Sequence, residues 1–261
     1  MPDIRLDKFI SERTEYTRSQ IKQMCAKGSV SVNGSVVKKA DTKINADSDK
    51  VSVGGRVLSA SRFSYILLNK PKGYVSSTND NDGESVLKLV PDELRTKGMF
   101  PAGRLDKDST GALLITDDGE LAHRICSPNN HISKVYIAEL ARPFEENYVE
   151  KFADGIVLAN GDVCAPVKVR QSKNSNKQAF IELHEGMYHQ VKRMFAAVGN
   201  HVENLKRISL GGLVLPENLP LGKCMCLLPK DIEQMFAVID FDVLLTIEDD
   251  FFSANSINNL G

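Results

Sequence analysis

The sequence of 261 residues contains no tryptophan, only five cysteines and no long apolar run. A membrane-spanning helix needs about 18 or more consecutive apolar residues, so the sequence excludes one. An odd number of cysteines without regular spacing excludes a disulfide framework and is typical of a reducing compartment. The first ten residues, MPDIRLDKFI, lack the apolar core of a secretory signal peptide. We therefore expect a cytoplasmic protein that does not contact a membrane.

Positive charge is missing from the C-terminal end of the chain. Residues 231–261 contain no lysine or arginine and seven acidic residues, whereas residues 1–62 contain twelve Lys and Arg against seven acidic residues. The segment between them is almost balanced, and the whole chain has a net charge of −1. The basic N-terminal part predicts an anionic partner. We expect residues 231–261 to form an acidic and apolar extension whose end is disordered.

Residues 1–60 have the pattern of a small domain of their own. Thr17 is a good helix N-cap, and Gly28 follows the apolar periodicity as a helix end. Asn33 and Gly34 form a two-residue turn between alternating apolar residues, which predicts a hairpin. These signals together predict helices over 4–13 and 17–28, followed by short strands on both sides of the turn and at 49–53.

Residues 63–230 predict a larger α+β domain. Apolar strand patterns outnumber helical ones and do not alternate regularly with them, so we expect a mostly antiparallel mixed sheet flanked by helices. The sequence predicts strands at 65–70, 112–115, 134–140, 179–186, 210–215 and 222–228, and helices at 119–127 and 187–200.

The segment PAGRLDKDSTGALLITDDG, residues 101–119, places two acidic residues on a glycine-bounded loop just before an apolar strand. Asp106 and Asp108 are consistent with solvated turn carboxylates or with a carboxylate held in place for catalysis. Asp106 to Thr110 also satisfies the D-x-D-x-T pattern of magnesium-dependent phosphotransferases of the haloacid dehalogenase class. In that class a buried strand precedes the first Asp, whereas here the apolar strand follows the acids, so this alternative is disfavoured.

A retaining glycosidase is a further alternative for two neighbouring carboxylates, because such enzymes hold them about 5 Å apart. No cluster of sugar-binding aromatic residues accompanies Asp106 and Asp108, and tryptophan is absent. We therefore disfavour this alternative as well.

Two resemblances account for these patterns. RLDKFI, TRSQIKQMCAKGSVSVNG and DKVSV resemble the S4 RNA-binding domain. GRLD followed by STG, together with KPKGYVSS, SKVYIAEL and EGMYHQVKRMFAAVGNHV, resembles the RsuA family of pseudouridine synthases, which modify uridine in ribosomal RNA. The resemblance implies a small N-terminal S4 domain, a pseudouridine synthase domain and an isomerase activity.

The motif QVKRMFAAVGNHV is most similar to the small-subunit branch of that family. This similarity implies that the substrate is 16S ribosomal RNA, with uridine 516 as the target by family analogy. A large-subunit (23S) enzyme of the same family and a non-catalytic S4-type assembly factor remain alternatives. The expected partner is structured ribosomal RNA in a small-subunit assembly intermediate, and we expect the protein to be a monomer.

The resemblance also implies roles for individual residues. Asp106 matches the catalytic carboxylate, and no cofactor or metal is required because the isomerisation is neither a redox reaction nor a transfer from outside. Lys192 stands where many relatives have an Arg paired with that Asp, and it provides a point charge without the guanidinium fork. The implied residues are Asp106, Tyr136 and Lys192 for catalysis; Arg104, Val191 and Arg193 for substrate binding; and Arg5, Arg18, Ser19, Lys22 and Lys27 for RNA binding.

Overall fold

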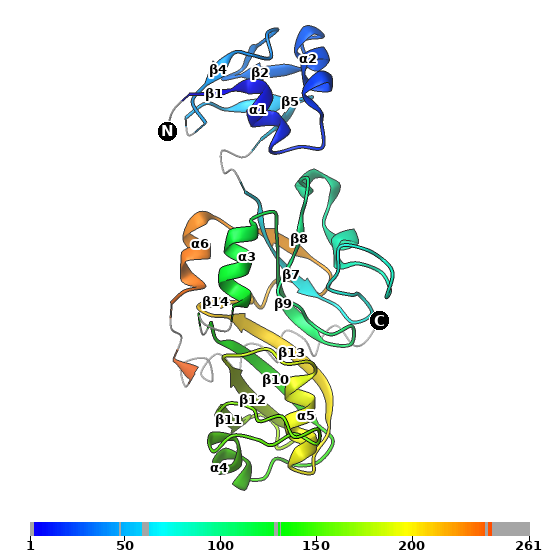
Figure 1. The fold of residues 1–261 in the computed structure, drawn as a ribbon, viewed down its shortest axis with the longest axis vertical. Helices are drawn as coiled ribbons and strands as arrows, with labels where there is room; N and C mark the ends of the chain where they lie inside the picture. Colours follow the sequence, from blue (N-terminus) through cyan, green and yellow to red (C-terminus); the bar gives the residue numbers. More distant parts are fainter. Residues whose placement is uncertain are drawn as a thin grey trace. The chain divides into compact units, whose positions relative to one another are not determined.

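The structure is a computed structural model that describes residues 3–46, 48–58, 63–127, 130, 132–237 and 240–241. The chain divides into two compact units (Figure 1). The first consists of residues 1–64, 91–99 and 116–118, and the second of residues 65–90, 100–115 and 119–261. No helix among the described residues is long and apolar enough to cross a bilayer.

The first unit contains two helices and a set of short strands. A four-stranded sheet has the order β3-β2-β5-β6, and β1 pairs separately with β4. The elements are β1 (Ile4–Arg5), α1 (Leu6–Ser11), α2 (Arg18–Ala26), β2 (Val30–Val32), β3 (Ser35–Val36), β4 (Lys43–Ile44), β5 (Val51–Val53), β6 (Arg56–Val57) and the 3-10 helix η2 (Asp92–Leu94).

Two sequence predictions for this unit, the helix cap and the hairpin turn, are confirmed. Thr17 caps α2 in a capping box, because its hydroxyl accepts from the Gln20 amide and the Gln20 side chain accepts from the Thr17 amide. Asn33 and Gly34 both have positive φ, at 52° and 82°, and join β2 to β3 as predicted. The first helix, in contrast, begins at Leu6 and not at residue 4, because Ile4 pairs with Ile44 in a strand.

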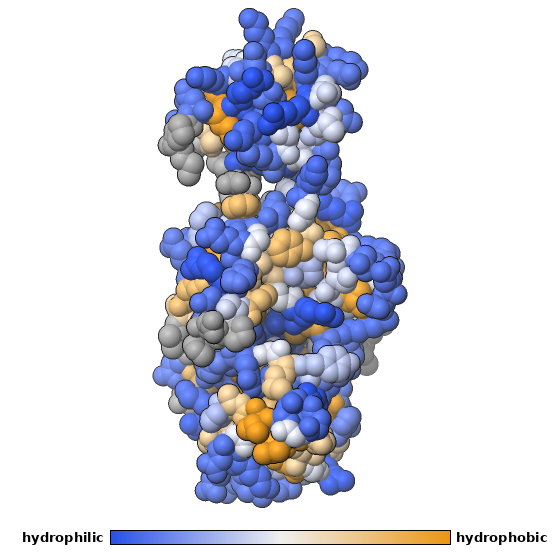
Figure 2. Space-filling view, in the orientation of Figure 1, coloured by the Kyte–Doolittle hydropathy of each residue, from blue (hydrophilic) through white to orange (hydrophobic). Residues whose placement is uncertain are grey.

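The apolar side chains of the two helices and the small sheet form one core within this unit. Ten buried residues make up this cluster, and Phe9, Ile21 and Val51 in it have no exposed surface. Hydrophilic residues dominate the outer surface of the unit in the view of Figure 2. The unit therefore has its own hydrophobic core beneath a polar surface.

The second unit is built on a nine-stranded sheet with the order β11-β12-β10-β13-β9-β7-β15, to which β14 and β8 add at β13 and β9. Its strands are β7 (Tyr65–Lys70), β8 (Phe100–Ala102), β9 (Thr110–Thr116), β10 (Lys134–Leu140), β11 (Lys168–Gln171), β12 (Gln178–Leu183), β13 (Val202–Leu210), β14 (Leu213–Val214) and β15 (Cys224–Cys226). Its helices are η1 (Val86–Leu89), α3 (Gly119–Cys126), α4 (Asn147–Ala153), α5 (Gln190–Ala197) and α6 (Pro229–Gln234).

The sheet is mixed, as the sequence predicts. β10 pairs antiparallel with both β12 and β13, and β7 pairs antiparallel with β15. β13 and β9 run parallel, with Arg207 opposite Gly111. This parallel pair joins the two halves of the sheet, so it determines where the loop before β9 lies relative to β10 and α5 (Figure 1).

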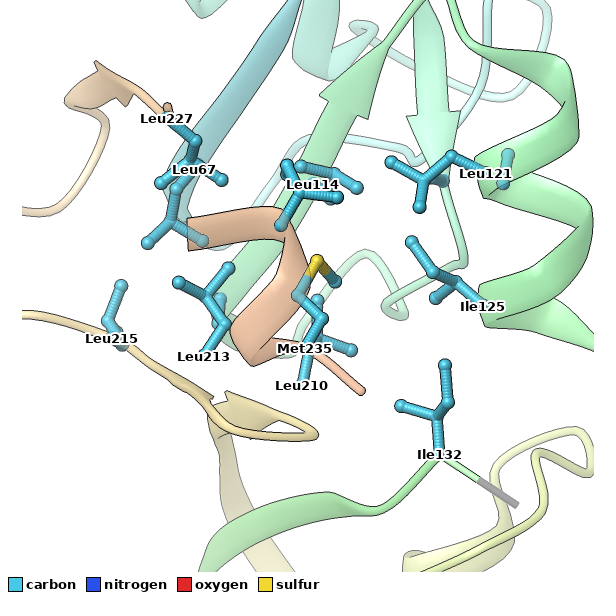
Figure 3. Packing of buried hydrophobic residues seen from close by; sticks show 14 residues of the cluster. Leu67, Leu114, Leu121, Ile125, Ile132, Leu210, Leu213, Leu215, Leu227 and Met235 are labelled. Atoms are coloured by element: carbon cyan, nitrogen blue, oxygen red, sulfur yellow. The ribbon is translucent and has the colours of Figure 1, made fainter. Parts of the chain in front are cut away.

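The C-terminal residues that the structure describes contribute to the core of the second unit. Met235 follows α6 and is fully buried, and Figure 3 shows its sulfur among Leu114, Ile125 and Leu210. Phe241 packs in a neighbouring cluster that contains Phe180. The expected disorder at the end of residues 231–261 concerns positions outside the described residues.

Gly111 allows β9 to approach β13 closely. Its φ is +103°, and a Cβ atom at this position would lie 2.1 Å from the Arg207 carbonyl oxygen. Gly161 also has a positive φ, at +89°, but a Cβ atom there would meet nothing within 4 Å. An alanine at Gly161 would therefore cause backbone strain alone, whereas an alanine at Gly111 would cause backbone strain and also a steric overlap with β13.

We expect Gly111→Ala to lower the free energy of unfolding by at least about 2 kcal/mol more than Gly161→Ala does. The control carries only the strain of a left-handed alanine, about 1–2 kcal/mol, whereas Gly111→Ala also forces two strands apart. Chemical denaturation of both variants measures the difference. Equal losses in the two variants would show that the close approach of β9 and β13 is unimportant.

Candidate active site

A loop of residues 103–109 connects β8 to β9 and carries Asp106. Ser76 holds the loop from one side, because its hydroxyl donates to the Leu105 carbonyl at 2.9 Å and accepts from the Leu105 amide at 3.1 Å. Within the loop, the Ser109 amide donates to the Asp106 carbonyl at 3.1 Å. The backbone on both sides of Asp106 is therefore fixed by hydrogen bonds.

Lys70 also holds this loop, through hydrogen bonds to its backbone carbonyl groups. Its side chain has no exposed surface, and its ammonium donates to the carbonyl oxygens of Asp106 and Ser109, both at 2.9 Å. A third bond, of 3.1 Å, goes to the Pro71 carbonyl. Burial lowers the pKa of Lys70 from 10.5 to about 8, although the negative charges of Asp108 and Asp106 oppose this shift.

The Asp106 carboxylate faces two basic side chains of the α5 region. Its Oδ1 lies 3.5 Å from His189 Nε2, and its Oδ2 lies 4.0 Å from Lys192 Nζ. The side chain is 27% exposed, so the carboxylate is accessible without being freely solvated. Asp106 and Lys192, far apart in the sequence, are thus brought together as predicted.

Lys192 has a closer partner than the predicted one. Its ammonium donates to Asp108 Oδ2 at 2.5 Å, and this hydrogen bond is the main reason why the pKa of Asp108 is lowered. Asp108 has no assigned role in the sequence analysis. The predicted pair of Lys192 and Asp106 is therefore incomplete. In the structure the Lys192 ammonium lies between the carboxylates of Asp106 and Asp108.

His189 precedes α5 in a left-handed conformation, with φ 50° and ψ 34°. For this reason the helix begins at Gln190, three residues later than the predicted start. The His189 ring stacks on the Tyr188 ring with the centroids 3.8 Å apart, and Tyr188 is 76% exposed. A non-glycine residue with positive φ is uncommon and often lies at a functional site.

A cavity of about 860 Å³ lies beside Asp106 in the second unit. Tyr136 on β10 and Val191 on α5 form part of its wall, and both are almost fully buried. Arg104 also lines the cavity and is exposed. Four of the sequence-predicted residues, Asp106, Tyr136, Val191 and Arg104, therefore line a single cavity.

Arg193 is the exception among the predicted substrate-binding residues, because it does not line this cavity. Its guanidinium donates to Asn160 Oδ1 at 2.6 Å and lies 3.3 Å from Asp162 Oδ2. Successive helical residues point in different directions, so Arg193 cannot share the carboxylate that Lys192 approaches. Its prediction as a substrate-binding residue is not supported by this geometry.

Four of the five predicted RNA-binding residues lie on α2 or at its end, and the fifth, Arg5, lies on β1. Arg18, Ser19, Lys22 and Lys27 are exposed, and the three cations form no ion pair within the described part of the chain. Arg5 differs, because its guanidinium forms a fork with Asp7 at 2.7 and 3.0 Å. Four of the five residues are thus free to meet a polyanion.

No group of three or more His, Cys, Asp or Glu side chains suited to a metal ion occurs among the residues that the structure describes. Two buried cations of the cavity region, Lys70 and Arg207, are absent from the sequence prediction. Lys70 ends the apolar strand β7, and a lysine there is an available signal; Arg207 lies in β13 among several polar residues, and the sequence gives no signal for its burial.

The chain matches known families in both units. Residues 4–51 match the S4 domain, and residues 64–197 match the RNA pseudouridylate synthase family. Ribosomal small subunit pseudouridine synthase A of Haemophilus influenzae is 40% identical over 234 residues, which cover 89% of this chain and 99% of that relative. The Escherichia coli K12 protein of the same name is 38% identical over 230 residues, covering 88% and 98%.

Similarity extends to a Bacillus subtilis protein named uncharacterized RNA pseudouridine synthase YtzG, which is 35% identical and covers 84% of this chain and 93% of its own length. A crystal structure of a pseudouridylate synthase has a TM-score of 0.62 and 38% identity, with coverage of 89% of this chain and 99% of that one. The chain belongs to the RNA pseudouridylate synthase family and carries an S4 domain. Enzymes of this family are isomerases.

The pH dependence of stability tests the role of Lys70. The pKa of Lys70 is about 8 in the folded protein and 10.5 ordinarily, so between these values the unfolded state binds more protons. Raising the pH from 8 to 10.5 therefore stabilises the wild type through this group. Lys70→Met lacks the group, so we expect the stability advantage of the wild type over the variant to increase across this range.

Chemical denaturation at several pH values between 7.5 and 10.5 measures this difference. Lys72→Met, at an exposed lysine two residues away, is the matched control. A difference between wild type and Lys70→Met that stays constant or decreases with pH would contradict the lowered pKa of the buried Lys70.

Proposed function

We propose that the protein converts one uridine of small-subunit 16S ribosomal RNA to pseudouridine, at uridine 516 by family analogy, with Asp106 as the catalytic carboxylate. The observation that carries this proposal is the position of the Asp106 carboxylate at a cavity lined by Tyr136 and Val191. The named function of relatives that match nearly the whole chain supports the choice of RNA.

The chemistry requires one well-placed carboxylate. The N1–C1′ bond breaks, the uracil turns over, and C5 joins C1′; the C5 proton is lost and N1 gains a proton. Atoms and electrons balance without an oxidant or an external group, so no cofactor enters the proposal. Asp106 acts as a nucleophile or as a base toward the ribose, and its fixed backbone keeps it in position for either role.

Residues that line the cavity or lie beside it position the substrate. A uridine within folded RNA must leave its stack, at a cost of a few kcal/mol that protein contacts offset. The Tyr136 ring and Val191 provide apolar surface for the extruded base, and Lys192 orients the carboxylates of Asp106 and Asp108. The exposed Arg104 is suited to a backbone phosphate at the rim of the cavity.

The S4 unit binds the ribosomal RNA and raises its local concentration at the cavity. Arg18, Lys22 and Lys27 present positive charges on one small unit that are unpaired within its described residues, which suits phosphates and RNA shape more than base sequence. We further propose that the enzyme works as a monomer in the cytoplasm on an assembly intermediate of the small subunit.

Asp106→Asn provides the direct test of the catalytic assignment. The amide is similar in shape to the carboxylate but can neither attack carbon nor accept a proton, so we expect no detectable pseudouridine. RNA affinity should remain within about threefold, because the S4 contacts are unchanged. Pseudouridine mapping of ribosomal RNA from cells that carry only the variant, together with binding to a 16S fragment, measures both.

Asp108→Asn is the matched control, since it lies two residues away and contacts the same lysine. We expect slower but measurable turnover in this variant. Pseudouridine formation by Asp106→Asn at the wild-type rate would exclude Asp106 as the catalytic group. Loss of a pseudouridine from 23S and not from 16S RNA in cells lacking the protein would assign it to the large subunit.

Binding by the S4 unit should weaken as salt increases. The logarithm of affinity falls by about 0.7–0.9 for each phosphate contact per tenfold rise in salt. We expect Lys22→Gln to reduce this slope by about one contact, whereas Lys50→Gln, at an exposed lysine away from α2, should not. Fluorescence anisotropy over a salt series checks the prediction, and an affinity independent of salt would contradict it.

A further inference from the structure

Arg207 is a buried cation in the wall of the cavity that hydrogen bonds do not fully satisfy. The residue is 1% exposed; its Nε donates to the Ala112 carbonyl at 2.7 Å, and its Nη1 donates to the Arg104 carbonyl at 3.3 Å. Its Nη2 has no hydrogen-bond partner among the residues that the structure describes. Buried guanidinium groups are normally paired with a negative charge, so this one requires an explanation.

Lys134 is a second cation at the same part of the cavity. It lies two residues before Tyr136 on β10, and therefore on the same face of the strand, and Tyr136 is in register with Arg207. The Lys134 ammonium donates to the Ile132 carbonyl at 3.0 Å, and its other two N–H groups have no partner among the described residues. Burial lowers the pKa of Lys134, and the positive charge of Arg207 lowers it further.

The acidic residues of the cavity do not neutralise this pair. Among the described residues, neither Lys134 nor Arg207 forms an ion pair with a carboxylate. Asp106 faces His189 and Lys192, and Glu185 accepts from the Gln190 side chain at 2.5 Å. Within the described part of the chain, this end of the cavity therefore has two positive charges and no carboxylate paired with either of them.

We propose that the end of the cavity formed by Lys134 and Arg207 binds a phosphate of the RNA, namely a phosphodiester adjacent to the uridine that is modified. Lys134 makes the direct contact through its remaining N–H groups, and Arg207 provides a buried positive charge behind it. A phosphate oxygen is a strong acceptor for such donors. The proposal depends on the proposed function, because that function places a uridine in this cavity.

Small nucleotides test the site directly. The Asp106→Asn background prevents turnover, so binding of uridine, uridine 5′-monophosphate and uridine 3′-monophosphate can be compared by calorimetry or NMR titration. We expect at least one monophosphate to bind about tenfold more tightly than uridine, the scale of one charge-assisted hydrogen bond. Lys134→Met in this background should reduce that preference to less than about threefold, and Lys134→Arg should restore it.

Lys206→Met is the matched control. Lys206 is also half-buried, its pKa is also lowered by burial, and it neighbours Arg207 on β13 without lining the cavity. This variant should keep the preference for the monophosphate. Equal preference in the Lys134→Met and parent proteins, or equal losses in the Lys134→Met and Lys206→Met variants, would overturn the proposal.

Kinetics on the RNA substrate separate binding from chemistry. In an otherwise wild-type protein we expect Lys134→Met to raise KM about tenfold while kcat changes by less than about threefold, as for a contact present in both ground and transition states. The salt slope of binding should also fall by about one phosphate contact. A decrease of kcat alone would contradict a phosphate contact.

The two proposals fail in different ways. A wild-type protein that prefers the monophosphate but forms no pseudouridine would overturn the proposed function and leave the phosphate site in place. A protein that forms pseudouridine but binds uridine and both monophosphates equally well would overturn the phosphate site alone.

Discussion

The buried ammonium group of Lys70 fixes the backbone of the loop that carries the Asp106 carboxylate. Lys70 ends β7, and its hydrogen bonds reach the carbonyls of Asp106 and Ser109 in the loop before β9. The Asp106 carbonyl oxygen points toward Lys70, and the Asp106 side chain lines the cavity. A charged donor that binds several carbonyls in a buried position makes the loop rigid, which suits a group that must meet one carbon atom.

The parallel pairing of β9 with β13 brings the rest of the site to that loop. Gly111 permits the approach, and the opposite residue, Arg207, is in turn paired with Tyr136 of β10. Asp106 thus reaches the cavity from one half of the sheet, while Tyr136 and the helix carrying Lys192 reach it from the other. The site therefore requires β9, β13 and β10 to be paired with one another.

Much of this arrangement follows from local sequence signals, and the remainder depends on tertiary contacts. The cap at Thr17 and the turn at Asn33 and Gly34 are determined by adjacent residues, so the sequence predicts them correctly. The preference of Lys192 for Asp108 depends on the distance between two segments 84 residues apart. The left-handed backbone at His189 is likewise not predicted, because positive φ is uncommon for any residue other than glycine and the helical periodicity extends across this position.

Charge of opposite sign at two parts of the cavity gives an orientation to any nucleotide that enters. Asp106 repels a phosphate group, whereas the pair formed by Lys134 and Arg207 attracts it. Tyr136 belongs to the same strand face as Lys134, so a base resting on its ring keeps its phosphate within reach of the cations. Electrostatic complementarity of this kind selects an orientation more than it adds affinity. In the proposed complex, the nucleotide therefore lies with its base and sugar toward the carboxylate and its phosphate away from it.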